Sequence, residues 1–321
     1  MNVQLRDRST AIPASLVSQA SFWLPDLLTC SAWTEHAPFG FWITEALKPR
    51  CVVELGVHHG FSYFVFCQAV ARLGIDARCF AVDTWVGDEH AGFYGDEVYE
   101  AACAHNRRYE SFSRLIRSDF SDACGQFADG SIDLLHIDGC HRYEIARRDF
   151  QSWLPKMSSR GVVLFHDTAE YGNGFGVYRL WEELSRQYPH FEFTHGHGLG
   201  IVAVGSNPPA KMGALFGTSV GLASTHAVRA EYERLGVSVA NYQRLAEQRD
   251  EIEHLRWQVA RLESVVAGYE SSTSWRVTAP LRAVAGPVNR IGGVAKKLRD
   301  TLREAVDHAA GPAEPVFRAD H

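Results

Sequence analysis

Acidic and histidine side chains follow two apolar runs of the sequence, at the points where the runs end. Asp138 ends the first run and His141 stands three residues after it, whereas the second run ends in the adjacent pair His166 and Asp167. Doubly wound sheets bind their ligands at the carboxyl ends of strands, so we expect these four side chains to line one crevice. Because histidine titrates near neutral pH, His141 suits the role of a general base.

The same cluster has the donor atoms of a metal site. Carboxylate oxygens and imidazole nitrogens suit Mg²⁺ or a similar divalent ion, and we expect Asp138, His166 and Asp167 to be the ligands. Alternatives stay open. The alternative role for His141 is that of a helix-capping or surface histidine. The alternative for Asp138 and Asp167 is a purely structural role. His136, inside the first run, is expected to be a core histidine.

A glycine-containing loop joins an apolar strand to an apolar helix within Cys51–Ser62. Gly56 and Gly60 let the backbone approach a ligand closely, and free N–H groups at the start of the following helix point into the loop. The next strand ends in Asp83, whose carboxylate can accept both hydroxyls of a ribose. This layout indicates a nucleoside site, with an ordinary strand-to-helix turn as the alternative.

The details of the loop distinguish between cofactors. A dinucleotide site requires the pattern Gly-x-Gly-x-x-Gly, but this loop carries Val57 and His58 where that pattern needs small residues. We expect Glu54 to face the ligand, and a negative charge there suits a cationic cofactor better than an anionic one. The sequence therefore favours a positively charged nucleoside cofactor.

This loop resembles the first motif of the class I S-adenosylmethionine-dependent methyltransferases. In that family the glycine loop cradles the methionine portion of the cofactor, and the acid after the second strand holds the ribose. An adenine contact follows the third strand, where a solvated turn acid is the alternative here. The resemblance implies cofactor contacts for Glu54, Gly56, Gly60, Ser62, Asp83 and Asp119.

The strand ends described first are similar to those of the metal-dependent sugar and natural-product O-methyltransferases of the macrocin O-methyltransferase type. The resemblance implies a metal-holding acid at Asp138 and a catalytic base at His141, which match the family's spacing. His166-Asp167 stands where the family often has two acids or Asp-Asn, so the metal position matches only in part.

Composition and charge exclude several classes of protein. The chain has 321 residues, with no apolar run long enough to span a bilayer and a polar, charged start that lacks the apolar core of a signal peptide. Its seven cysteines form no Cys-x-x-Cys pair, which favours reduced thiols in a cytoplasm. Residues 1–205 carry 17 basic and 25 acidic side chains, so a nucleic-acid partner is disfavoured.

Apolar runs with strand and helix character alternate up to residue 205. This alternation predicts an α/β fold with a doubly wound, mostly parallel seven-stranded sheet. The last two strands are separated only by residues 195–198, so they must pair antiparallel. We expect strands at 51–55, 78–82, 113–117, 132–137, 161–165, 191–194 and 199–204, and helices at 61–73, 96–109, 143–153 and 175–188.

The chain divides into further regions on composition. We expect a helical cap over 1–48, the cofactor-binding methyltransferase domain over 49–205, a linker over 206–225, a coiled coil over 226–270 and a basic, partly disordered tail over 271–321. The aromatic side chains of the cap are expected near the cofactor, with plain core packing as the alternative.

Apolar residues in the predicted coiled coil repeat every seven positions. Leu245, Ile252, Val259 and Val266 form one row, and Leu255, Leu262 and Tyr269 form its companion, which predicts self-association. A long helix folded back on the catalytic domain is the alternative. Tyr232, Leu235, Val239 and Tyr242 follow a shifted register.

The segment from Ser271 to Arg282 resembles a short stretch of bacterial polysaccharide glycosyltransferases. Basic and apolar side chains interleave from Arg276 to Arg303, which indicates either peripheral contact with an anionic membrane surface or a solvated tail.

Together these features predict a cytoplasmic S-adenosylmethionine-dependent O-methyltransferase that acts on a sugar hydroxyl in bacterial surface-polysaccharide or glycolipid assembly, at the inner face of the membrane if the tail binds there. The alternative is an inactive cofactor-binding scaffold whose coiled coil recruits or spaces glycan-assembly enzymes.

Overall fold

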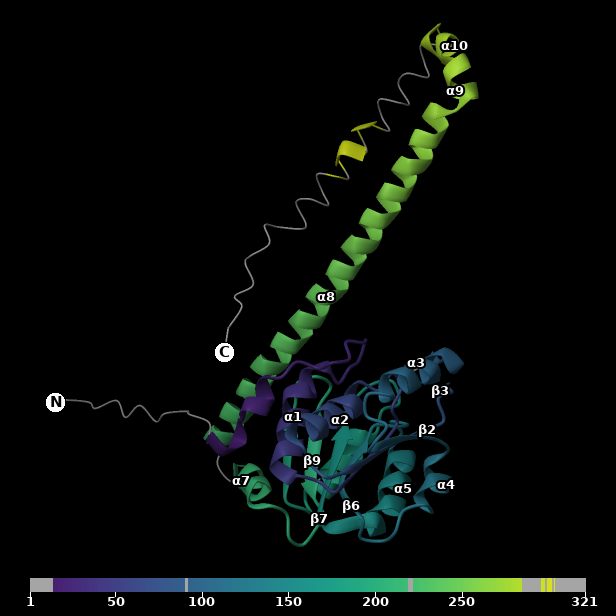
Figure 1. Ribbon diagram of the computed structural model, residues 1–321. Coiled ribbons are helices and arrows are strands. Elements are labelled where there is room, and N and C mark those ends of the chain that lie inside the picture. Colours follow the sequence, from purple (N-terminus) through teal and green to yellow (C-terminus); the bar gives the residue numbers. More distant parts are fainter. Residues whose placement is uncertain are drawn as a thin grey trace, which may run out of the picture. The chain divides into compact units, whose positions relative to one another are not determined.

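The computed structural model describes residues 14–89, 92–218, 222–284, 296–297, 299–301 and 303. Its centre is a seven-stranded sheet with helices on both faces (Figure 1), which confirms the predicted fold class. The strands lie in the order β5 (Ser113–Arg117), β2 (Arg78–Asp83), β1 (Cys51–Leu55), β6 (Ile132–Ile137), β7 (Met157–His166), β9 (Leu199–Ala203) and β8 (His190–Phe193).

The first five strands of this order are parallel, and the last two close the sheet. β9 pairs antiparallel with both β7 and β8, as the short connection before it requires. β1 and β6 are neighbours although β2 to β5 lie between them in sequence, so the chain changes its direction of travel across the sheet at this point. Doubly wound sheets bind their ligands at such a switch point.

Alternate residues of each strand face opposite sides of the sheet, and each side has its own apolar core. Val52 and Leu134 face one side, whereas Val53 and Leu135 face the other. The first side packs against α1 (Ala37–Leu47), α2 (Phe61–Leu73), α3 (Asp96–Asn106), α7 (Ala210–Thr218) and the start of α8 (Leu222–Ser271). The second packs against α4 (Phe120–Cys124), α5 (Tyr143–Trp153) and α6 (Val177–Leu184).

Short elements complete the description. A two-stranded ribbon of β3 (Gly87–Asp88) and β4 (Gly92–Phe93) follows β2. The 3₁₀ turns are η1 (Ala14–Leu16), η2 (Gln19–Phe22), η3 (Thr34–His36) and η4 (Leu154–Lys156).

The aromatic side chains of the N-terminal region belong mostly to the core. Trp33, Phe39, Phe41 and Trp42 are buried, and Phe22 is exposed. Of the region expected as a helical cap, α1 is its one α-helix among the described residues, and plain core packing describes these four rings.

The beginning of α8 is part of the domain that contains the central sheet. Tyr232 and Val239 are buried in the first core, the Tyr232 hydroxyl donates to Leu16 O at 2.8 Å, and Gln243 Nε2 donates to Thr29 O at 2.9 Å. One compact unit ends at Gln243 and a second begins at the next residue. The segment expected as a linker therefore contains α7, and the first turns of the expected coiled coil fold back on the domain.

The second unit contains the remainder of α8, then α9 (Thr273–Val277) and α10 (Ala279–Val284). The Ser272 Oγ atom caps α9 by accepting from the Trp275 N–H at 3.2 Å, and the Arg282 guanidinium lies 3.7 Å from the Trp275 ring centroid. Most of the expected basic tail lies outside the described residues. Within the described part of the chain, none of the helices combines the length and apolar character needed to cross a bilayer.

Candidate functional site

The loop after β1 depends on glycine at Gly56. Its φ is +84°, and a Cβ atom there would stand 2.0 Å from the Asp138 carbonyl oxygen, which follows the adjacent strand β6. Gly60, with φ of +86°, is the N-cap of α2. Only glycine adopts such backbone angles without strain, so the loop presses closely against the end of β6 and leaves its backbone accessible.

Asp83, at the end of β2, holds this loop in place. Its Oδ2 atom accepts hydrogen bonds from the N–H groups of Val57 at 2.7 Å and His58 at 3.0 Å, and its Oδ1 atom accepts from the Trp85 N–H at 2.7 Å. The Trp85 ring donates from Nε1 to the His58 carbonyl at 3.0 Å. The loops after β1 and β2 are therefore one hydrogen-bonded unit.

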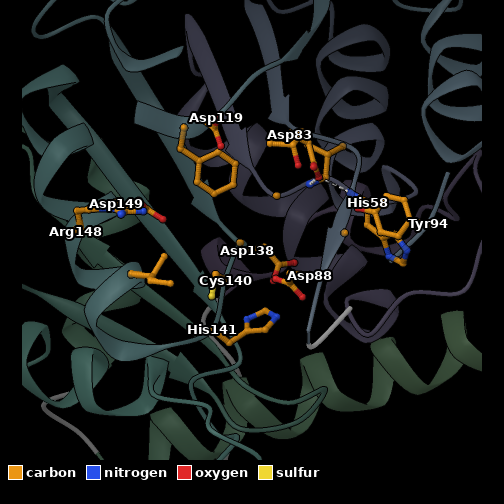
Figure 2. Close-up of a pocket in the computed structure, with 17 residues that line it drawn as sticks. His58, Asp83, Asp88, Tyr94, Asp119, Asp138, Cys140, His141, Arg148 and Asp149 are labelled. Atoms are coloured by element: carbon orange, nitrogen blue, oxygen red, sulfur yellow. Dashed lines mark hydrogen bonds and ion pairs between the residues drawn. The ribbon is translucent and has the colours of Figure 1, made fainter. Parts of the chain in front are cut away.

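A cavity of about 290 Å³ opens beside this unit. We name it the Asp83 pocket, and Figure 2 shows Asp83 and Asp119 on one side of it with Asp88, Asp138 and His141 in the middle. Asp119 is the N-cap residue of α4. The side chains that line it include His58, Asp83, Asp88, Asp119, Phe120 and Asp138.

Glu54 lines neither the Asp83 pocket nor the neighbouring cavity on the other side of the loop. It is fully buried between β1 and its neighbours, where its Oε1 atom accepts from the Ser62 hydroxyl at 2.7 Å and its Oε2 atom is 3.0 Å from His136 Nδ1. Burial raises the pKa of Glu54, and His136 partly opposes that rise. In this geometry Glu54 supports the loop from the buried side rather than facing a ligand. Its hydrogen-bond partner Ser62, in contrast, lines that neighbouring cavity.

A second cavity, of about 400 Å³, lies on the other side of the loop. We name it the Asp167 pocket. It shares the Gly56–His58 segment, Asp138 and His141 with the Asp83 pocket. Its remaining walls come from the segment before α1, from the start of α2, from the end of β7 with the loop after it and from the β8–β9 hairpin. They include Trp33, Ser62, His166, Asp167, Glu170, Asn173, Phe175 and His197.

Three of the predicted residues meet where the two cavities join. One ligand-type atom from each of Asp138, His141 and Asp167 lies within 4.8 Å of the others. His141 Nδ1 is 3.1 Å from Asp167 Oδ2, and the His141 ring stacks on Phe175 with centroids 4.7 Å apart. Asp167 has φ of +61°, an uncommon angle for a residue with a side chain, of the kind often held at functional sites.

His166 lies behind the two carboxylates. Its Nδ1 atom is 3.2 Å from Asp138 Oδ1 and 3.3 Å from Asp167 Oδ2, and its Nε2 atom is 3.1 Å from the Gly196 carbonyl. Burial alone would lower its pKa, but the charges of both carboxylates outweigh burial and raise it well above the usual value. For Asp138, burial alone would raise the pKa, but the nearby His166 outweighs burial and lowers that pKa. With both nitrogens facing acceptors, His166 donates hydrogen bonds here. His166 was expected as a metal ligand and His141 as the base, but the imidazole in the three-residue cluster is that of His141.

Several lining residues carried no signal in the sequence. His58 has φ of +50° and lines both pockets, Tyr94 reaches the Asp83 pocket directly after the ribbon, and Phe175 supports His141. Each sits in a loop where no periodicity exists, so only the three-dimensional arrangement identifies it.

The residues present fit a nucleoside cofactor with a positive charge. Gly56 leaves its backbone uncovered, carboxylates of Asp83, Asp88 and Asp119 can accept from hydroxyl or amino groups, and the Phe120 ring offers an apolar face. The donor set of Asp138, His141 and Asp167 also fits a divalent ion, for which two carboxylates and one imidazole are suitable ligands.

Comparisons with known proteins agree with this geometry. Residues 53–168 match the family described as a methyltransferase domain, which agrees with the methyltransferase class expected from the glycine loop. The chain is also 46% identical over 247 residues to the uncharacterized protein y4gI of Sinorhizobium fredii. That alignment covers 77% of this chain but 26% of the relative, so the chain spans about a quarter of that protein's length.

Solved structures are similar to the chain at a lower level of identity. Cofactor-bound Rv0187 from MTB has a TM-score of 0.43 and 19% identity, with 60% of this chain and 89% of that chain covered. The O-methyltransferase TomG from Streptomyces achromogenes, involved in tomaymycin synthesis and solved with S-adenosylmethionine, has a TM-score of 0.42 and 16% identity, with 57% and 83% covered. These similarities are too low to transfer a substrate or a residue's role.

Proposed function

We propose that this protein is an S-adenosylmethionine-dependent O-methyltransferase that methylates a hydroxyl of a sugar or glycan. The observation that carries the proposal is the junction of the two cavities at Gly56, Asp138 and His141. Methyl transfer needs the donor and the acceptor on opposite sides of the migrating methyl group. Two adjoining cavities with a common wall meet that requirement, with the donor in the Asp83 pocket and the acceptor in the Asp167 pocket.

His141 is the base in this proposal. A sugar hydroxyl is a weak nucleophile until its proton is removed, and general-base catalysis is typically worth about 10²–10⁴ in rate. Asp167 accepts from His141 Nδ1–H at 3.1 Å, and in that tautomer Nε2 is the basic nitrogen that receives the hydroxyl proton. Phe175 stacks on the ring and limits its rotation. In enzymes that activate a nucleophile, the base is often oriented by a third group in this way, here the Asp167 carboxylate.

In its alternative role, His141 would hold a divalent ion together with Asp138 and Asp167, with His166 orienting the two carboxylates from behind. Such an ion would lower the pKa of the acceptor hydroxyl and align it. If His141 were itself a ligand, the base would have to be another group. Activity with and without a metal chelator therefore distinguishes the two roles of His141.

The chemistry of the Asp167 pocket supports a polar acceptor with an apolar face. Glu170 and Asn173 offer hydrogen-bonding groups, and Trp33 and Phe175 offer ring surface, a combination that suits the hydroxyls and C–H faces of a sugar. The segment around Trp275 supports a setting in surface-polysaccharide or glycolipid assembly, and the basic tail supports a peripheral place at the membrane.

The test begins with calorimetric titration of S-adenosylmethionine and NAD⁺ into the wild type and Asp119→Ala. We expect micromolar binding of S-adenosylmethionine alone, weakened by Asp119→Ala. Methyl transfer to sugar nucleotides and lipid-linked glycans is then assayed with Mg²⁺, with a chelator and with Asp138→Ala. Cofactor binding without transfer to any glycan would instead support the inactive scaffold, and preference for NAD⁺ would overturn the methyltransferase assignment.

A further inference from the structure

The part of α8 beyond the catalytic domain carries an apolar seam that the described chain leaves exposed. The seam consists of Ile252, Leu255, Val259, Leu262, Val266 and Tyr269. Leu262 and Tyr269 are 64% and 66% exposed, and Leu255 and Val266 are 41% and 43% exposed. Spacings that alternate between three and four residues place these side chains along one stripe of the helix, which is the pattern that pairs with another helix.

We propose that this seam binds the same segment of a second copy of the chain in antiparallel orientation. The proposal goes beyond methyl transfer and does not depend on it. The occupant is a second copy because the charges beside the seam are complementary to themselves only when one helix is reversed.

A row of charged residues runs along one flank of the seam. It consists of Arg249, Arg256, Glu263 and Glu270, and all four side chains are exposed. The row begins with two cations and ends with two anions. When a second helix lies antiparallel, Arg256 faces Glu263 of the second copy and Arg249 faces Glu270 of the second copy. Symmetry repeats both contacts, so four attractive pairs form and none is repulsive.

The same alignment also buries only apolar side chains between the helices. Ile252 meets Tyr269 of the second copy, Leu255 meets Val266, and Val259 meets Leu262, and symmetry repeats these layers. Gln248 and Leu245 fall outside the paired stretch. The six layers extend over Ile252–Tyr269, a length of roughly 27 Å at the helical rise.

A parallel pair is less favourable on both counts. It would place Gln248 against Gln248 of the second copy in the core between the helices. Arg244 would face Arg249 of the second copy, which is repulsive, and the attraction between Glu251 and Arg256 of the second copy would compensate for this. Alternating β-branched residues and leucines suit two strands, but the charges decide the orientation.

Charge reversal in the full chain tests the orientation. Dimerisation is measured by sedimentation equilibrium at low salt for the wild type, Arg256→Glu, Glu263→Arg and the double variant. We expect each single reversal to raise the dimer dissociation constant about tenfold, because two symmetry-related pairs change from attraction to repulsion. The double reversal recreates both pairs with exchanged signs, so it restores dimerisation to within about twofold of the wild type.

Arg261→Glu is the matched control, since it makes the same chemical change on the outward side of the helix and should leave dimerisation unchanged. Circular dichroism checks that every variant keeps its helix content. In a parallel dimer Glu263→Arg would have no effect and the double variant would stay as weak as Arg256→Glu, which would overturn the antiparallel pair. A wild type that stays monomeric at the highest concentration would overturn self-association itself.

Discussion

Asp167 Oδ2 lies 3.1 Å from His141 Nδ1, so one carboxylate fixes which nitrogen of the imidazole is turned toward the acceptor side of the crevice. Asp167 comes directly after β7 and His141 lies shortly after β6, and these strands are neighbours in the sheet. We expect His141→Gln to lower kcat by about 10²–10⁴ while the dissociation constant of S-adenosylmethionine changes by less than about threefold. Steady-state kinetics combined with calorimetry separates the two effects, and an undiminished kcat would assign the base to another residue.

Glu54 and Asp119 allow the cofactor contacts to be tested against each other. Glu54 is buried with Ser62 and His136, whereas Asp119 lines the Asp83 pocket. We expect Glu54→Gln, which keeps an acceptor for the Ser62 hydroxyl, to leave cofactor affinity within about threefold, and Asp119→Asn to weaken it by about tenfold, a loss of roughly 1.4 kcal/mol. Calorimetric titration measures both. A large loss in the Glu54 variant with unchanged stability would show that this carboxylate contacts the cofactor after all.

Gly56→Ala tests the close approach of the loop to the end of β6. The added Cβ atom would stand 2.0 Å from the Asp138 carbonyl, in addition to the strain of a φ of +84°. We expect a loss of at least about 3 kcal/mol in the free energy of unfolding, measured by urea denaturation, together with loss of cofactor binding. Gly74→Ala is the control: it has φ of +61° and open space around its Cβ position, so it should cost about 1–2 kcal/mol.

Asp133 makes stability depend on pH. This buried carboxylate accepts from the Arg50 N–H at 2.9 Å and Nε at 3.1 Å, and from the Ser158 hydroxyl. Burial would raise its pKa, but these donors outweigh burial and lower it. A lowered folded-state pKa adds stability that is complete above the unfolded-state pKa, near about 3.9, and is lost as pH falls through the folded-state value.

We therefore expect Asp133→Asn to reduce the free energy of unfolding at pH 7 by about 2–4 kcal/mol, and the difference from the wild type to shrink as pH falls below about 4. Urea denaturation at a series of pH values gives this difference directly. Asp129→Asn removes an exposed carboxylate 2.8 Å from Lys156 Nζ and should change stability by less than about 1 kcal/mol at any pH. A pH-independent deficit in the Asp133 variant would contradict this account.

Two tyrosines of α8 test where the domain ends. Tyr232 is buried and its hydroxyl donates to Leu16 O, whereas Tyr242 is 44% exposed. We expect Tyr232→Ala to destabilise the domain by about 3–5 kcal/mol and Tyr242→Ala by less than about 1 kcal/mol, measured as loss of unfolding free energy. Equal losses would mean that the helix contributes nothing specific at its beginning.

Local patterns in the sequence predicted the central sheet well. The strands at Cys51–Leu55, Ser113–Arg117 and Ile132–Ile137 have the expected bounds. The first and third are mostly apolar runs that end at turn residues. α4, with five residues, is too short to show a period, and α7 lies in a stretch whose Pro208-Pro209 pair indicated a linker. The sequence also showed that the apolar positions at the beginning of α8 follow a different register from those further along. It could not show which of these positions pack against the domain, because that depends on tertiary packing.

The candidate site shows the same division. The positions of Asp138, His141, His166 and Asp167 at strand ends followed from the sequence, and the structure places them together. Glu54 pairs in register with His136 of β6, and this partnership across strands determines its burial. Sequence spacing contains no information on strand register, so the orientation of Glu54 and the donating role of His166 could not be derived from it.

The two pockets use different stretches of the chain outside their common wall. The walls that belong to the Asp83 pocket alone follow β2, β5 and β6, whereas those of the Asp167 pocket alone come from residues 30–33, 59, 61–62, 166–175 and 197. Substitutions in one set leave the other set's walls untouched. The chain can therefore diversify what it recognises on one side of the common wall while conserving what it binds on the other, so that a change of acceptor need not cost the protein its methyl donor.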